Sequence, residues 1–169
     1  MELQGMPTRA TDALVVIAPD GIAVHPVALP GLLGMTLAEG RLPPGQFGVH
    51  AHRSLEQITY VLSGSVVVTM GDGETGETTE VVCGAGDTIA TPPLVSLSFG
   101  NPGLEEARVL FICAPPYPAD DADTMTLEGH RALTEGERRA ARERIRAVRA
   151  LLDARFAALE ARLGRGPLD

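Results

Sequence analysis

Residues 43–68 read PPGQFGVHAHRSLEQITYVLSGSVVV, a stretch that joins two β-type runs to a pair of histidines one residue apart. Proline and glycine open the stretch, and Gly64 interrupts its longer run, as turn residues do between strands. Residues 57–62 alternate polar or small side chains with larger apolar ones, a period of two that is typical of a strand. The stretch therefore predicts short strands joined by tight turns, with His50 and His52 on one face of a strand.

The same pattern continues in both directions from this stretch. From residue 13 to residue 114, short β-type runs are separated by turn sequences such as PDG, PPG and NPG. Strands at intervals of roughly ten residues, broken by Gly, Pro, Asp and Asn, indicate an all-β barrel or sandwich. We therefore expect residues 1–116 to form one β-barrel domain with an N-terminal extension.

The character of the chain changes after this domain. Residues 117–133 are rich in Pro and Asp and predict a linker, because such residues do not continue a sheet. Thr134 and Glu137 then have the spacing of a capping box, and Gly164 is a suitable stop for a helix over residues 134–164. Apolar residues recur along it at steps of three and four: Ala141, Ile145, Val148, Leu152, Phe156, Leu159 and Leu163. We expect this amphipathic helix to pack on the barrel or on the same helix of a second subunit.

Composition limits the classes of function. The 169 residues suffice for one domain and an appendage. Residues 131–165 hold ten arginines and five acidic residues, a net charge of +5. Because the whole chain has a net charge of −8, the remaining residues carry −13. An acidic body argues against nucleic-acid binding. Apolar runs of strand length exclude a membrane span, and the first residues lack a signal-peptide pattern, so we expect a cytoplasmic location.

The two histidines suit metal binding. Two positions apart on a strand, His50 and His52 project to the same side, about 6–7 Å apart along the chain. Imidazole is a common ligand for Zn, Cu, Fe and Ni, and for Mn when oxygen ligands accompany it. A histidine pair alone does not define a metal site, so the surrounding residues have to show whether one is present.

Two motifs around these histidines resemble those of the cupin superfamily. The first combines a glycine, H-x-H, an acidic or amide residue and a second glycine, and the second combines Gly-Asp, a proline, a histidine and an asparagine. The matching residues are Gly45, His50, His52, the Glu56/Gln57 position and Gly64, followed by Gly86, Asp87, Pro92 and Asn101. The resemblance implies a cupin-type jelly-roll barrel with a small-molecule pocket inside it, commonly as a homodimer.

The resemblance also implies a metal site, with one departure. The family spacing places the acidic ligand at Gln57, while Glu56 remains an alternative if the strand begins with a bulge. In the second motif, the family's glycine after the proline falls on Leu94 and the family's histidine falls on Leu97. Leucine does not bind metal. The expected ligands of a divalent Fe, Mn, Zn or Ni ion are therefore His50 and His52 with Gln57 or Glu56.

Three functions fit this pattern. The first is a metal-assisted enzyme of the dioxygenase, isomerase or cyclase type that uses His50, His52 and Gln57 on an apolar or aromatic metabolite, such as a natural-product intermediate. The second is a metal-free isomerase or cyclase with histidine acid-base catalysis, and the third is a non-catalytic small-molecule-binding protein. The expected substrate pocket is lined by Thr59, Leu94, Leu97 and Phe99.

Overall fold

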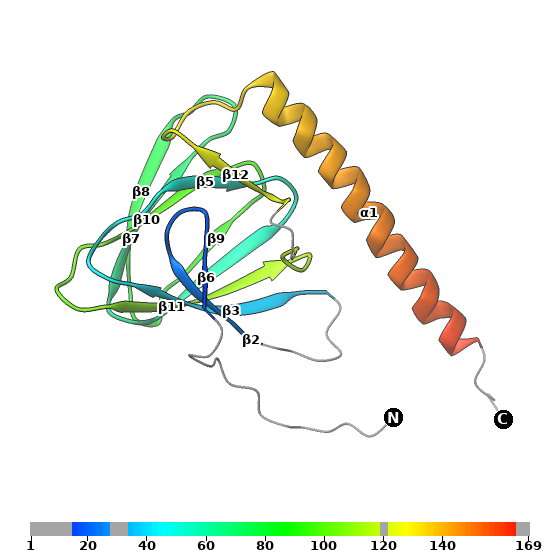
Figure 1. Cartoon of the computed structure of the whole chain (residues 1–169), viewed down its shortest axis with the longest axis horizontal. Helices are drawn as coiled ribbons and strands as arrows, with labels where there is room; N and C mark the ends of the chain where they lie inside the picture. The colour runs from blue at the N-terminus through cyan, green and yellow to red at the C-terminus, as the bar shows by residue number, and fades with distance from the viewer. Residues whose placement is uncertain (1–14, 28–33, 119–121, 165–169) are drawn as a thin grey trace.

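The computed structural model describes residues 15–27, 34–118 and 122–164. Within them the chain forms two antiparallel β-sheets of the jelly-roll type and one C-terminal helix, as the sequence predicted (Figure 1). The first sheet has the strand order β1 (Val16–Ile17), β2 (Ala23–Val27), β3 (Thr36–Leu42), β11 (Ala107–Ala114), β6 (Glu56–Ser63) and β9 (Thr88–Thr91).

The second sheet contains the strand that carries the two histidines. Its order is β12 (Thr124–Leu127), β5 (Val49–His52), β10 (Ser96–Asn101), β7 (Ser65–Gly71) and β8 (Thr78–Gly84), and the short β4 (Gly45–Gln46) also pairs with β10. In the register of β5 and β10, His50 lies opposite Leu97. The position of the missing family histidine is therefore next to the site.

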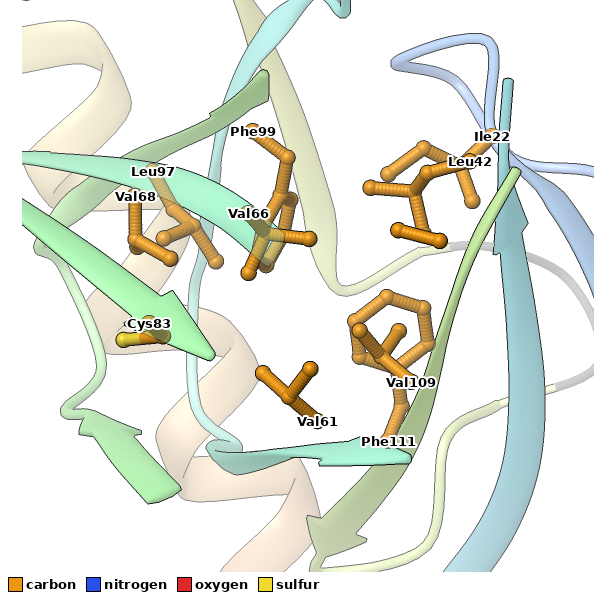
Figure 2. Packing of buried hydrophobic residues seen from close by; sticks show 11 residues of the cluster. Ile22, Leu42, Val61, Val66, Val68, Cys83, Leu97, Phe99, Val109 and Phe111 are labelled. Carbon is orange, nitrogen blue, oxygen red and sulfur yellow. The ribbon is translucent and has the colours of Figure 1, made fainter. Parts of the chain in front are cut away.

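The main hydrophobic core fills the space between the two sheets (Figure 2). It forms because inward residues alternate with outward ones along strands such as β6 and β11. Side chains such as Leu42, Val61, Val68 and Val109 are at most 1% exposed. Ile22, Phe99 and Phe111 belong to this core and also line a cavity together with His50 and His52.

The predicted linker contains a strand. Residues 124–127 form β12, which pairs with β5 so that Thr124 lies opposite His52 and Thr126 opposite His50. Met125 and Leu127 alternate with these threonines and are buried. The prediction of a linker over 117–133 was wrong there, because the Pro and Asp residues that precede this four-residue strand hid its alternation.

Helix α1 spans Glu135–Leu163 and begins with the predicted capping box. The Thr134 hydroxyl accepts a hydrogen bond from the Glu137 backbone amide, and the Glu137 carboxylate accepts one from the Thr134 amide. Figure 1 shows α1 to one side of the two sheets. Among its described residues, Ala141 is the only buried one, so much of the apolar stripe stays uncovered by its own chain. No helix in the described ranges has the length and apolar character to cross a membrane.

Candidate functional site

An apolar cavity of about 600 Å³ opens between the two sheets. Strands β2, β3, β5, β6 and β11 contribute to its wall, and β1 and the segment around Tyr117 border it. The polar side chains of the wall are few: Asp20, Thr36, His50, His52, Gln57, Tyr117 and Thr124, together with the thiol of Cys113. A mostly apolar cavity with a few convergent polar groups is typical of a small-molecule site.

His50 and His52 both line the apolar cavity from β5. They are 6% and 4% exposed, and their ring centroids are 5.1 Å apart with an interplanar angle of 73°. The strand period places them on the same face, as the sequence indicated. The structure therefore brings the two candidate ligands together inside the protein.

Gln57 joins the histidines, and Glu56 does not. Along β6 Gln57 is buried and Glu56 is exposed, so the two side chains lie on opposite faces of the strand. Gln57 Oε1 lies 3.3 Å from His52 Nε2, and Gln57 Nε2 donates a hydrogen bond to the Thr59 hydroxyl at 3.3 Å. The Cys113 thiol donates to the same Oε1 at 3.8 Å. The alternative that used Glu56 as a ligand needs a bulge that β6 does not have here, because Gln57 and Glu56 pair regularly with Cys113 and Ala114.

Of the four predicted pocket residues, Phe99 lines the cavity and the other three do not. Thr59 is buried behind Gln57 and holds its amide. Leu97 is fully buried in the main core. Leu94 packs against the second apolar cluster, around Ala51, in the turn before β10. The sequence could not distinguish a core position, such as that of Leu97, from a position in the cavity wall.

Two carboxylates that the sequence did not single out lie behind the histidines. Asp20 Oδ2 is 3.3 Å from His50 Nδ1, and Asp123 Oδ2 is 3.7 Å from His52 Nδ1. The Tyr117 ring stands edge-on to His52, with centroids 5.9 Å apart, and its hydroxyl is 2.5 Å from the Thr124 hydroxyl. Both aspartates belong to segments that looked like a turn and a linker, so only the tertiary structure reveals their role.

Burial keeps His52 and the Cys113 thiol uncharged at neutral pH. Burial lowers the pKa of His52 to about 4, and the neighbouring His50 adds to this effect while Asp123 opposes it. Burial also raises the pKa of the Cys113 thiol to about 12, and Asp123 adds to that shift. His52 is therefore a neutral imidazole, the form that binds metals and accepts protons.

The comparisons with known proteins agree with this architecture. A family model described as a cupin domain matches residues 38–113, which include β5, β6, β10 and most of β11. The chain contains a cupin domain. Asp20 and Asp123 lie outside the residues that match the cupin model.

Solved structures share the cupin fold at low sequence identity. A Cupin 2 conserved barrel domain protein from Salinispora arenicola is 18% identical over 64% of this chain and 87% of its own, with a TM-score of 0.53. A predicted oxalate decarboxylase from Thermotoga maritima is 21% identical over 65% of this chain and 99% of its own, with a TM-score of 0.54. CapF, solved with the inhibitor 3-isopropenyl-tropolone, is 18% identical over 72% of this chain, with a TM-score of 0.58.

These similarities establish the fold and no particular activity. This chain spans about a third of the length of CapF, 34%. No curated protein matches the sequence significantly. The function of this cupin domain therefore has to be argued from its own cavity and side chains.

Proposed function

We propose that this protein is a small-molecule cupin enzyme in which His50, His52 and Gln57 hold a divalent metal ion at one end of the apolar cavity. The main support for this proposal is that His52 faces two hydrogen-bond acceptors and can donate to only one of them. Its Nδ1 is buried without a hydrogen bond and faces the Asp123 carboxylate, while its Nε2 faces Gln57 Oε1. One neutral imidazole has a single N–H, so it cannot donate to both acceptors.

A bound cation would satisfy the ring nitrogen of His52 that carries no proton. If Nδ1 of His52 carries the proton, the lone pair of Nε2 and the oxygen of Gln57 face each other 3.3 Å apart. Both are ligands for a divalent ion, and His50 adds a second imidazole nearby. The imidazolium form, which would also satisfy both acceptors, is disfavoured because burial lowers the pKa of His52 to about 4.

The proposed ligand set is neutral and small. Among the described residues, no three His, Cys, Asp or Glu side chains are arranged to hold a metal, so the site depends on the Gln57 amide. An amide oxygen brings no negative charge, and we expect weaker binding than a carboxylate would give. The ion would supply a Lewis acid with positions left for substrate.

The side chains of the cavity have distinct roles in this proposal. His50, His52 and Gln57 orient the reacting group through the ion that they would hold. When Nε2 of the neutral His52 does not bind the ion, this atom can accept a proton. The apolar walls, including Phe99 and Phe111, bind the body of the substrate and exclude water. Tyr117, against His52, limits the space on that side of the ring.

The lining favours an uncharged apolar or aromatic substrate. None of the described residues that line the cavity is an arginine, and the chain has no lysine. A substrate with a free carboxylate or phosphate would therefore lack a cationic partner at the bottom of the cavity. Arg53, which lies close in sequence, instead donates to the carbonyl oxygens of Ala122 and Thr124.

A second candidate is a metal-free isomerase or cyclase. The contacts that favour it are the two histidine–aspartate pairs, because a carboxylate behind an imidazole supports proton transfer at its other nitrogen. His50 and His52 would then act as acid and base on the same apolar substrate. A homodimer is the proposed assembly in either case, supported by the exposed apolar residues of α1.

The experiment that tests catalysis is a turnover screen of uncharged aromatic and polyketide-like compounds with the wild type and His52→Ala. Metal-dependent turnover that His52→Ala abolishes, with an unchanged circular dichroism spectrum, supports the first proposal. Turnover that survives exhaustive chelation supports the metal-free candidate. Compounds that bind both proteins without being converted would identify a binding protein and contradict both.

A further inference from the structure

Each of the two candidate histidines has a buried aspartate behind it. Asp20 is 8% exposed and Asp123 is 1% exposed, and their Oδ2 atoms lie 3.3 and 3.7 Å from the Nδ1 atoms of His50 and His52, within ion-pair distance. Asp20 precedes the residues that match the cupin model and Asp123 follows them. A segment before the matched residues and a segment after them thus each place a carboxylate next to one of the two rings.

Asp20 is held firmly in its turn. Its Oδ1 accepts a hydrogen bond from the Ile22 amide at 3.1 Å, and its backbone carbonyl accepts one from the Gly48 amide at 2.8 Å. A Cβ at Gly48 would lie only 3.1 Å from the Cα of Asp20, so the turn fits closely against the residues that lead into β5. The carboxylate therefore has a fixed position relative to His50.

Asp123 is held by donors from two further parts of the chain. The backbone amides of Ser54 and Leu55 each lie 3.3 Å from its Oδ2, and the Ser54 hydroxyl donates to its Oδ1. Arg144 of α1 contributes Nε at 3.4 Å from Oδ1. These donors hold the Asp123 carboxylate in a nearly inaccessible position.

We infer that Asp20 and Asp123 are positioning residues that place the proton of each imidazole on Nδ1 and so present Nε2 of both histidines to the cavity. This inference rests on the proposed role of His50 and His52 in the function of the cavity. A carboxylate that accepts the second N–H of a ligating histidine fixes its tautomer and raises its basicity. Such contacts are commonly long before a substrate engages the site.

The competing contact of His52 does not reverse this assignment. If the proton of His52 were on Nε2, it would donate to the neutral Gln57 Oε1, and the lone pair of Nδ1 would face a full negative charge on Asp123. An N–H dipole that points at a carboxylate is attracted to it, and in a buried site this attraction is substantial even at 3.7 Å, where no hydrogen bond forms. The Nδ1–H form is therefore the favoured neutral tautomer of His52.

The test is long-range ¹H–¹⁵N NMR of the imidazoles in ¹⁵N-histidine-labelled, chelator-treated protein at pH 7.5. The inference predicts that His50 and His52 are both Nδ1–H tautomers in the wild type. Asp20→Asn should shift His50 toward Nε2–H, and Asp123→Asn should do the same for His52. Asp153→Asn, an exposed change on α1, is the matched control and should leave both unchanged.

The wild-type spectrum decides the inference even if Asp123→Asn does not fold. Nε2–H tautomers at both histidines would overturn it, as would an unchanged His50 tautomer in a folded Asp20→Asn protein. A Co²⁺ titration of the same proteins gives the second readout, with an expected 10–100-fold loss of affinity in folded Asp20→Asn and Asp123→Asn and no loss in Asp153→Asn. A wild type that binds no Co²⁺ but shows both Nδ1–H tautomers would contradict the proposed metal function while supporting the two positioning residues.

Discussion

Gln57 and Glu56 are adjacent residues on opposite faces of β6. Substitutions at Gln57 therefore test metal binding, and a substitution at Glu56 is their control. Gln57→Glu places a carboxylate beside His52, so we predict about tenfold tighter binding of Co²⁺ or Zn²⁺, since the change adds a charged oxygen ligand. Gln57→Leu should weaken binding by at least as much. Calorimetric titration of the metal measures both changes.

Glu56→Gln is the control for that experiment. Its side chain is exposed on the outer side of the strand, so its loss of charge should leave the metal affinity within about twofold of the wild type. A large loss of affinity in Glu56→Gln, with Gln57→Glu unchanged, would show that the ligand assignment on β6 is wrong.

The buried His52 predicts a pH dependence of stability. Its pKa is about 4 in the folded protein and near the ordinary 6.5 in the unfolded chain, so the unfolded state binds the extra proton first. Stability should therefore be complete above pH 6.5 and fall as the pH drops toward 4. Between pH 7 and pH 4.5 the loss due to His52 is on the order of 2 kcal/mol.

Urea denaturation of the metal-free wild type and His52→Gln at pH 7 and 4.5 measures this contribution. His52→Gln should lose less stability on acidification, because glutamine does not titrate. Equal losses in the two folded proteins would show that His52 titrates normally and is not desolvated as the structure indicates.

At the scale of elements, β5 and β6 were predictable because their alternation is regular and their turns contain glycine. Strand β12 was not, because its four residues follow a segment with the composition of a linker. Asp20 and Asp123 were missed for a related reason. An aspartate in a turn has many local uses, and only the pairing of β12 with β5 brings Asp123 behind His52.

For strand β10 too, the sequence did not reveal where a side chain lies, and the structure here gives a prediction about stability. Leu97 stands at the position of the family histidine, but it is fully buried in the main core and not part of the cavity wall. Leu97→Ala should therefore lower the free energy of unfolding by about 2–5 kcal/mol through lost burial and a new cavity. Chemical denaturation checks this value, and a loss below about 1 kcal/mol would contradict the core assignment.

At the scale of the whole molecule, α1 leaves apolar surface exposed. Phe156 and Leu163 are 62% and 78% exposed, and they lie on a stripe that a single copy of the chain does not cover. We predict a homodimer in which this part of α1 contacts a second copy, because contiguous exposed apolar surface marks association. Phe156→Glu/Leu163→Glu should convert the dimer to a folded monomer.

Multi-angle light scattering measures that change, with Arg146→Glu, an exposed and polar position on the same helix, as the control. The double variant should run at half the mass of the wild type and the control at the full mass. A wild type that is monomeric at high concentration would contradict the dimer.

Mass spectrometry of untagged protein, as purified and after reloading, measures its metal content and so tests whether His50, His52 and Gln57 hold a divalent ion. The comparison is between the wild type, the His50→Ala/His52→Ala variant and the control His130→Gln, whose histidine contacts Ser96 and Ser98 away from the cavity. We predict close to one divalent ion per chain in the wild type and the control, and none in the double variant. A wild type that stays free of metal after reloading would contradict this prediction.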